Sequence, residues 1–92
     1  MTIQSKLYRV LTENKNREKI EEFAACGFDA FTIYEATGYW RGTRESTLVI
    51  EVSGIAIEMQ VSALARLIAV YNGQECVLVQ EIETNSRLIY AK

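Results

Sequence analysis

The sequence predicts an α+β domain in which one antiparallel sheet of four strands carries two helices on one face. Three observations lead to this fold class. Four segments typical of strands and two segments with helical spacing of apolar residues follow one another in the order β-α-β-β-α-β. The two middle strand segments are joined by a short stretch containing glycine, which favours an antiparallel hairpin. The 92 residues suffice for one domain, residues 1–92, and are too few for two.

The first half of the chain has the pattern of a strand, a helix and a second strand. Residues 7–12 are rich in strand-forming side chains and end at a polar cluster. Asn14 is the predicted N-cap of an amphipathic helix of about three turns, and Gly27 is its expected end. Residues 28–39 then alternate with a period of two, as strands do.

The second half repeats this order. Residues 46–53 alternate like a strand, and residues 57–71 carry the strongest helical periodicity in the chain, with Asn72-Gly73 as the predicted C-cap. Residues 75–82 are almost continuously apolar, which predicts a strand covered on both faces. Residues 87–90 are expected to form either a short added strand or a tail.

Composition argues against several classes of function. The ten Lys and Arg residues are outnumbered by twelve Asp and Glu residues, whereas a protein that binds the phosphate backbone of nucleic acids needs an excess of basic side chains. Histidine is absent, which removes the commonest general base and metal ligand, so enzymatic activity and a metal site are not expected. Cys26 and Cys76 lack the spacing of a zinc or redox site and are predicted to be small buried side chains.

The N-terminus lacks the apolar core of a signal peptide, and no apolar run approaches the roughly 20 residues of a membrane span. A cytoplasmic protein is therefore expected.

The order of elements, with two right-handed crossovers, is that of the ferredoxin-like plait, in which both helices lie on one face of the sheet. The other face is then bare. Both faces of the middle strands are rich in apolar residues, so either register exposes a hydrophobic patch of the kind that marks an interface. We therefore expect a homo-oligomer in which the bare sheet faces meet, with Tyr34 and Val49 among the interface residues.

The stretch between the two middle strands carries the only tryptophan. Trp40 is expected to pack against a neighbouring subunit, or alternatively to stack on a planar ligand. Arg41 and Arg44 flank it, and two hypotheses follow for them: they bind the carboxylate or phosphate of a ligand, or they form ion pairs between subunits with Glu45 or Glu51.

Two further charged groups allow alternative interpretations. Lys15 and Arg17 lie at the predicted start of the first helix and either form a solvated face or point at an anionic ligand. Glu35, Glu45 and Glu51 are placed so that they could converge across the hairpin for acid-base chemistry or for binding a hard cation, although they are more simply surface carboxylates.

Part of this sequence resembles a known superfamily. Residues 27–42 followed by residues 45–51 are similar to the second strand, hairpin arm and third strand of PII-like signalling proteins and of the related CutA-like proteins. The Glu-x-x-Gly pattern of residues 35–38 is the PII-like feature. The Tyr-Trp-Arg-Gly turn of residues 39–42, followed by Glu and an apolar strand, resembles CutA.

The resemblance implies a non-enzymatic regulatory or ligand-sensing protein that forms a tight homotrimer, with ligand clefts between subunits at the base of the arm. In this chain the corresponding ligand-binding residues are Gly38, Tyr39, Arg41 and Arg44, and the implied ligand is an adenine nucleotide or a small anion. Two features depart from PII proteins: the arm is too short for their long mobile loop, and residues 71–75 contain one glycine where those proteins have a glycine-rich phosphate-binding turn.

Other classes of function remain as alternatives. One is a structural or adaptor oligomer that binds another protein and takes no small-molecule ligand. RNA-recognition domains share this strand order and stack bases on aromatic residues of their central strands. Residues 48–52 contain no aromatic side chain, so RNA binding is disfavoured.

Overall fold

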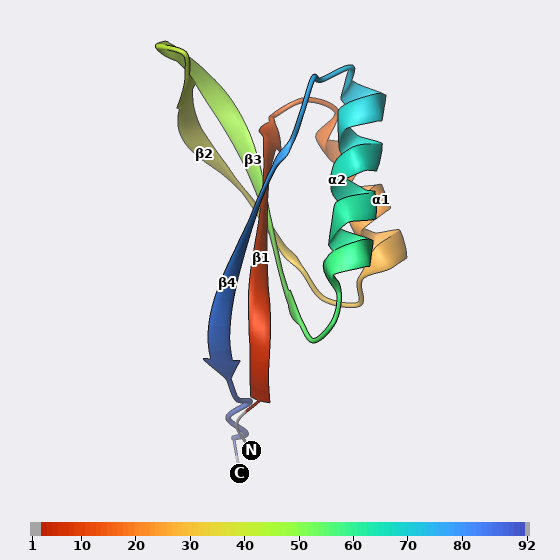
Figure 1. The fold of residues 1–92 in the computed structure, drawn as a ribbon, viewed down its shortest axis with the longest axis vertical. Helices are drawn as coiled ribbons and strands as arrows, with labels where there is room; N and C mark the ends of the chain where they lie inside the picture. Colours follow the sequence, from red (N-terminus) through yellow and green to blue (C-terminus); the bar gives the residue numbers. More distant parts are fainter. Residues whose placement is uncertain (1–2, 92) are drawn as a thin grey trace.

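The computed structural model describes residues 3–91 and has four strands and two helices (Figure 1). The elements, in chain order, are β1 (Ile3–Glu13), α1 (Arg17–Gly27), β2 (Thr32–Trp40), β3 (Thr43–Gly54), α2 (Glu58–Asn72) and β4 (Leu78–Ser86). The strands form one sheet in the order β2-β3-β1-β4, and all three pairings are antiparallel. Both helices lie on the same face of the sheet (Figure 1). The predicted α+β ferredoxin-like fold is confirmed.

The hydrophobic core lies between this sheet face and the two helices. Pairing of Val10 with Ile50 aligns β1 and β3 so that their even-numbered residues point toward the helices. The buried apolar side chains are Tyr8, Val10, Ile20, Ala24, Leu48, Ile50, Val52, Val61, Leu64, Ala65 and Ile68. Burial of an aliphatic side chain of this size contributes about 1.5–3 kcal/mol, so this layer is the main source of stability.

The opposite face of the sheet is open and carries an apolar strip. Leu11 pairs with Leu78, and Leu7 pairs with Ile82, so side chains of β1 and β4 meet on this face. Leu78 and Ile82 are exposed. No helix covers this side (Figure 1), which agrees with the predicted bare face.

The prediction that the fourth strand is covered on both faces is wrong. β4 is an edge strand, and eight of the nine residues from Leu78 to Ser86 are exposed in the isolated chain. Its apolar residues therefore contribute to the surface of the subunit. The alternative of an extra C-terminal strand is not realised, because residues 87–91 make no strand pairing.

The start of α1 differs from the sequence-based expectation, whereas the end of α2 agrees with it. The N-cap of α1 is Asn16, in the left-handed conformation (φ 58°) and without a side-chain cap bond, so the predicted cap at Asn14 is wrong. Gly73 closes α2 in the left-handed conformation (φ 67°), as predicted. No helix in the described residues is long and apolar enough to cross a membrane.

The β2–β3 hairpin forms an arm that extends beyond the rest of the sheet (Figure 1). Trp40 pairs with Thr43, which leaves only Arg41 and Gly42 in the turn. Both have positive φ, 51° and 80°, as in the type I′ turn that matches the twist of two-residue hairpins. The strands therefore continue through most of the stretch between residues 39 and 46, which the sequence left between the two predicted strands.

Candidate functional site

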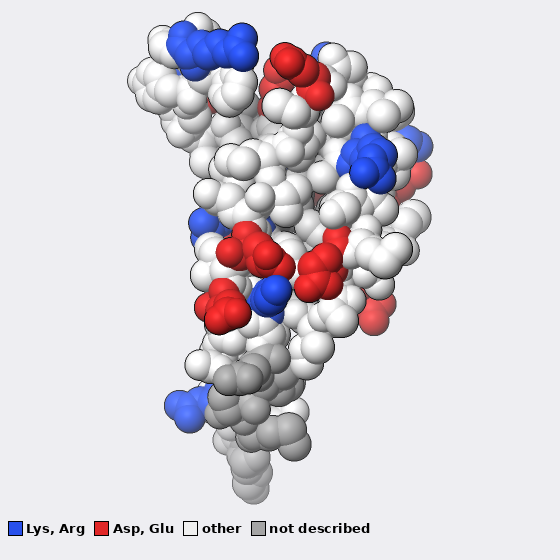
Figure 2. Space-filling view, in the orientation of Figure 1, with Lys and Arg blue, Asp and Glu red and all other residues white. Residues whose placement is uncertain are grey.

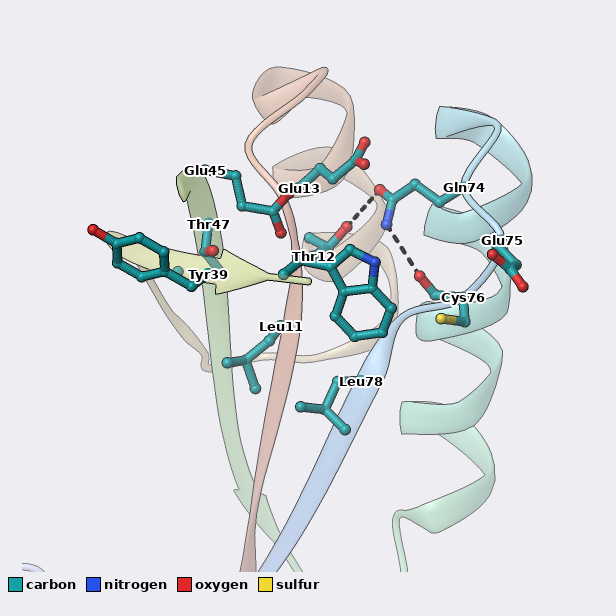
Figure 3. A pocket seen from close by; sticks show the side chains of 12 residues that line it. Leu11, Thr12, Glu13, Tyr39, Glu45, Thr47, Gln74, Glu75, Cys76 and Leu78 are labelled. Carbon is teal, nitrogen blue, oxygen red and sulfur yellow. Dashed lines mark hydrogen bonds between the residues drawn. The ribbon is translucent and has the colours of Figure 1, made fainter. Parts of the chain in front are cut away.

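A cavity of about 310 Å³ opens at the base of the arm (Figure 3). It lies between the arm, the end of β1 and the loop that joins α2 to β4. The described residues that line it are Leu11, Thr12, Glu13, Gly38, Tyr39, Trp40, Glu45, Thr47, Gln74, Glu75, Cys76 and Leu78. The cavity therefore combines apolar and aromatic side chains with carboxylates and one amide.

Gly38 leaves room for the Thr47 side chain at the cavity wall. A Cβ atom at this position would lie 2.5 Å from the Thr47 hydroxyl oxygen, closer than real Cβ contacts come. A glycine inside a strand often marks a close approach of this kind. The Thr47 side chain consequently occupies the space next to Gly38.

Trp40 supplies the largest aromatic surface of the cavity. Its side chain is 55% exposed, although it is the last residue of β2 and the arm turn follows it directly. The Arg41 guanidinium lies over its ring, 5.2 Å from the centroid, in a cation–π contact. The ring therefore has a cation over it in the isolated subunit.

A hydrogen-bond network fixes the loop on the other side of the cavity. The Gln74 side-chain oxygen accepts a hydrogen bond from Thr12 Oγ1 at 2.7 Å, and Gln74 Nε2 donates to the Cys76 carbonyl (Figure 3). The same oxygen also accepts from Asn72 Nδ2 at 2.7 Å. Asn72 also accepts from Asn16 Nδ2 at 2.8 Å. Thr12 and Asn72 are buried. The network ties β1, α2 and the α2–β4 loop together.

The C-terminus of α2 reaches this loop, and its backbone donors are already used. The Gly73 N–H donates to the Val70 carbonyl, and the Gln74 N–H donates to the Ala69 carbonyl. The Lys15 ammonium donates to the Asn72 carbonyl at 2.7 Å. A helix C-terminus carries a partial negative charge, and Lys15 partly compensates it.

Carboxylates dominate the charge of the cavity. Glu13 pairs with Thr47 across β1 and β3, and Glu45 is two residues from Thr47, so both lie on the same face as diagonal neighbours. Figure 3 shows them near each other, with Glu75 in the α2–β4 loop across the cavity. None of the described lining residues is Lys or Arg.

The residues predicted to bind a ligand do not all line the same hollow in one subunit. Gly38 and Tyr39 line the cavity. Arg44 lines a second, more open hollow on the arm together with Glu35 and Glu45, and Glu45 also lines the first cavity. Arg41 lies in the turn over Trp40.

The predicted interface residues occupy different environments. Tyr34 is 39% exposed on the open face, whereas Val49 is only 3% exposed and has little surface left to bury in an interface. Next to them, Arg9 Nε lies 3.0 Å from Glu51 Oε2, and the Tyr34 hydroxyl donates to the same oxygen at 2.8 Å. The hydrogen bonds from Tyr34 and Arg9 lower the pKa of Glu51.

The alternative in which Glu35, Glu45 and Glu51 converge is not realised. Glu35 lies on the helix side of the hairpin and binds Arg17, whereas Glu51 lies on the open face. Arg17 also pairs with Glu21 at 2.8 Å, so its charge is compensated within the subunit. Across the described residues, no group of three or more His, Cys, Asp or Glu side chains could hold a metal ion.

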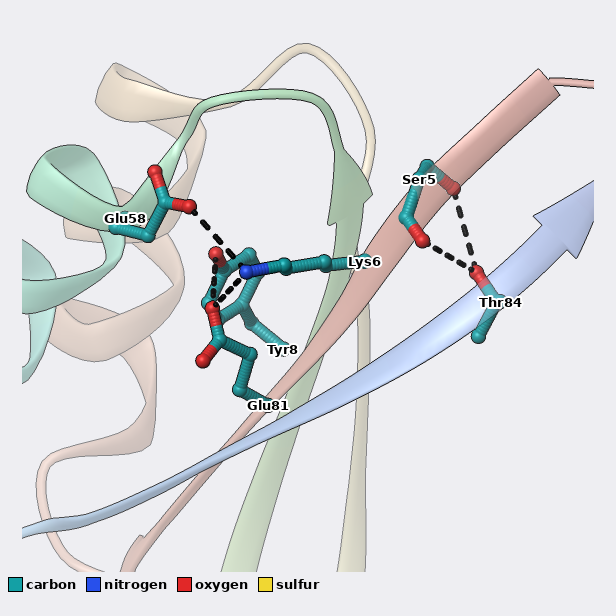
Figure 4. A network of polar contacts seen from close by, with 6 residues as sticks. All are labelled: Ser5, Lys6, Tyr8, Glu58, Glu81 and Thr84. Carbon is teal, nitrogen blue, oxygen red and sulfur yellow. Dashed lines mark hydrogen bonds and ion pairs between the residues drawn. The ribbon is translucent and has the colours of Figure 1, made fainter.

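A second polar network lies in the middle of the β1–β4 pair, on the helix side of the sheet. Figure 2 shows acidic side chains gathered around a basic one in this region. Lys6 Nζ lies 2.9 Å from Glu81 and 3.7 Å from Glu58, and the Tyr8 hydroxyl donates to Glu81 (Figure 4). The hydrogen bond from Lys6 lowers the pKa of Glu81, and burial raises the pKa of Tyr8. This network joins β1, β4 and α2 and has the features of a structural contact.

The two cysteines are exposed, so the prediction that they are buried is wrong. Cys76 lines the cavity, while Cys26 lies in α1.

No protein-family model matches the chain, and no curated protein sequence matches it. Solved structures do. CPII, a nitrogen regulatory PII-like protein from Thiomonas intermedia K12, superposes with a TM-score of 0.68 at 14% sequence identity, covering 97% of this chain and 100% of its own. This chain has the PII-like fold. The CPII structure contains ADP, AMP and bicarbonate.

Two further neighbours support the same assignment of the fold. A proposed PII-like signalling protein from Thermus thermophilus has a TM-score of 0.60 at 20% identity, with 92% of this chain and 90% of that chain covered. CutA1 from Oryza sativa has a TM-score of 0.61 at 14% identity, with 95% and 85% covered. The resemblance to PII-like and CutA-like proteins inferred from residues 27–51 therefore extends over the fold of almost the whole chain.

Sequence reasoning missed several residues of the cavity. In the sequence, Glu13 belongs to the polar cluster that ends the first predicted strand, and Gln74 and Glu75 follow the predicted cap of the second helix. Neither position indicated that these side chains line a cavity. A usable signal was present in the polar run Asn72-Gly73-Gln74 at the end of an apolar helix, because polar side chains at a helix end commonly hydrogen-bond neighbouring loops.

Proposed function

We propose that this protein is a PII-like regulatory or ligand-sensing protein without enzymatic activity, and that it acts as a homotrimer. The observation that carries the proposal is the PII-like fold over almost the full chain, together with the hollow that Arg44 lines on its short arm. The absence of histidine from the sequence supports a role without acid-base catalysis. A cytoplasmic location stays a prediction from the N-terminal sequence.

The open sheet face supports self-association. Leu78 and Ile82 are exposed there, beside Leu7 and Leu11. Exposed apolar patches on small domains mark interaction sites. A chain of 92 residues that folds as a monomer buries only a modest fraction of its unfolded surface. Burial of this face in an oligomer would therefore add stability.

The proposed ligand is an adenine nucleotide or a small anion, as in the CPII structure. Such a ligand needs basic groups to bind its negative charge. The basic side chains of the arm are Arg44, in the second hollow, and Arg41, in the turn. An anion site would therefore lie on the Arg44 side of the arm and be completed by a neighbouring subunit.

Light scattering combined with calorimetry tests the proposal. A trimer at micromolar concentration that binds ADP or bicarbonate, with binding weakened in Arg44→Ala, is the expected result. Lys19→Ala, on the outer surface of α1, is the matched control for loss of one basic side chain. A monomer, or binding that is unaffected by Arg44→Ala, would contradict the proposal.

An adaptor oligomer is the second candidate. It is favoured by the lack of basic side chains among the described cavity-lining residues, because a nucleotide phosphate would find no partner there. An intact trimer with no calorimetric response to nucleotides or anions, together with a protein partner that binds the arm, would support it.

A further inference from the structure

We propose that Arg9 and Glu51 on the open face of the sheet bond to the same two residues of neighbouring copies of this chain, and that these bonds fix the register in which the subunits associate. The inference rests on the proposed homotrimer and deepens it, because it names the groups that select one arrangement of the open faces. It follows from the polarity of this face, the position of the ion pair and the bonds that the pair leaves unmade.

The open face carries a polar row between two apolar rows. The polar row crosses all four strands and consists of Thr32, Glu51, Arg9 and Gln80. The apolar row nearer the arm consists of Tyr34, Val49, Leu11 and Leu78. On the other side of the polar row, Leu7 lies opposite Ile82. Hydrophobic contacts are non-directional, so the apolar rows alone would allow neighbouring subunits to slide. The polar row removes this freedom, because it also needs partners when the face is covered.

The ion pair lies in the middle of this row, on the two central strands β1 and β3. In the isolated subunit the side chain of Arg9 is 32% exposed and that of Glu51 is 24% exposed. Covering the open face removes much of this remaining contact with water. A charged group that loses water without gaining partners is strongly unfavourable. A subunit that covers the face must therefore bond to this pair.

The pair has bonding capacity left for such a neighbour. Among the described residues, Arg9 donates from Nε to Glu51 Oε2, and the same oxygen accepts from the Tyr34 hydroxyl. A guanidinium has further N–H donors on its terminal nitrogens, and a carboxylate has a second oxygen. Every buried side-chain nitrogen and oxygen of the described residues has a partner, so the unbonded atoms of this pair reach the surface.

A second copy of this chain fits these groups. Each subunit offers donors on Arg9 and an acceptor on Glu51, so the open face is complementary to itself in charge. In a closed ring of identical subunits, each contact joins different patches of neighbouring copies. Arg9 of one subunit can then bond to Glu51 of the next all round the ring. An unrelated partner would have to supply both an acid and a base in the same register.

Bonds of this kind select an arrangement more than they add affinity. A buried ion pair roughly balances its desolvation cost, whereas removal of one partner leaves an uncompensated charge. In coiled coils, a single buried polar residue fixes register and oligomeric state at a cost in stability. We therefore assign association to the apolar rows and its register to Arg9 and Glu51.

Replacements by leucine separate these two roles. Arg9→Leu leaves Glu51 without its cation and should weaken association about 30-fold or more, measured by analytical ultracentrifugation. Arg66→Leu, at an exposed position of α2, is the matched control and should leave association unchanged. Arg9→Leu/Glu51→Leu should associate at least as tightly as the wild type, because no charge is left unpaired. It should give a mixture of masses, because nothing fixes the register.

A mixing experiment tests whether the bonds cross between subunits. Arg9→Glu puts a second acid in the row and Glu51→Arg puts a second base there, so each variant alone should associate weakly. When the two chains are mixed, oligomers that contain both should form, because contacts between unlike chains join opposite charges. Native mass spectrometry detects them. Circular dichroism checks the fold of each variant, and the leucine replacements decide the question if a charge reversal unfolds the chain.

Several outcomes would overturn the inference. A trimeric wild type whose association is unchanged in Arg9→Leu contradicts this inference and leaves the proposed homotrimer intact. A uniform trimer of Arg9→Leu/Glu51→Leu would remove the register role. Folded charge-reversal variants that form no mixed oligomers would place the bonds within one subunit. A monomeric wild type contradicts the proposed function and this inference together.

Discussion

At the scale of single residues, the two buried polar side chains Thr12 and Asn72 matter most for the site. Asn72 is 3% exposed and connects Asn16 to Gln74, whose side chain forms part of the cavity wall. A buried polar group stabilises the fold only when its partners are present, because an unpaired one keeps its desolvation cost.

The variant Asn72→Ala should reduce the free energy of unfolding by about 1–3 kcal/mol, since it leaves polar partners of Asn72 without a bond. Urea denaturation measures this effect. Asn85→Ala, at an exposed position of β4, is the control and should change stability by less than about 0.5 kcal/mol. Equal losses in the two variants would contradict a special role for Asn72.

The lowered pKa of Glu51 in the folded state leads us to expect that stability depends on pH. The hydrogen bonds from Tyr34 and Arg9 lower its pKa in the folded state, so unfolded chains bind this proton more readily. The stabilisation is present above the pKa of an unfolded glutamate, about 4.3, and is lost as the pH falls through the lower folded value.

Melting curves of the wild type and Glu51→Gln between neutral pH and about pH 3 check this expectation. The wild type should lose more stability than Glu51→Gln in the acid part of the range, because the variant has no carboxylate to protonate. Glu18→Gln should keep the dependence of the wild type. Parallel curves for the wild type and Glu51→Gln would show that the network on the open face does not affect acid stability.

At the scale of elements, the arm is defined by its two-residue turn. Gly42 has φ 80°, a conformation that costs a residue with a side chain about 1–2 kcal/mol. The turn holds Trp40 opposite Thr43, so it also sets where the aromatic wall of the cavity lies.

Replacing Gly42 by Ala should therefore lower the free energy of unfolding by about 1 kcal/mol, after the smaller entropy of the unfolded chain is allowed for. A Cβ atom at Gly42 would contact nothing, so the effect is one of backbone conformation alone. Gly27→Ala is the control: its Cβ would also be in open space, but its φ is not positive. If both variants unfold alike in urea, the turn is not the cause.

At the scale of the whole molecule, the sheet is covered on one side only. The open face combines the apolar strip of β1 and β4 with the network around Glu51. Edge strand β4 adds unpaired backbone groups next to this strip. A single subunit thus leaves a continuous interaction surface, which is the structural basis for the proposed homotrimer.

The variant Ile82→Glu places a charge on this strip and should convert the oligomer to monomers, because a carboxylate buried without a partner is strongly unfavourable. Light scattering at micromolar concentration measures the change in mass. Met59→Glu, 84% exposed on α2, is the control and should leave the mass unchanged. An oligomer that survives Ile82→Glu would place the interface elsewhere.

The sequence by itself determined the number, type and order of the elements and the end of α2 at Gly73. These features depend on local periodicity and local backbone preference, which neighbouring residues encode. It also placed the hairpin correctly, although its strands run further toward Trp40 and Thr43 than the residue pattern suggested.

Only the tertiary structure decided which residues share a surface. Tyr34 and Val49 are paired on the same open face, yet Val49 is buried and Tyr34 is exposed. Val49 lies in central strand β3, with strands on both sides, and Tyr34 lies in edge strand β2, so the sheet order decides their burial. An apolar run is likewise compatible with a central or an edge strand, and only the crossover connections place β4 at the edge. The acidic character of the cavity comes from Glu13, Glu45 and Glu75, which lie far apart in the chain and line one hollow because the sheet and the α2–β4 loop bring them to it.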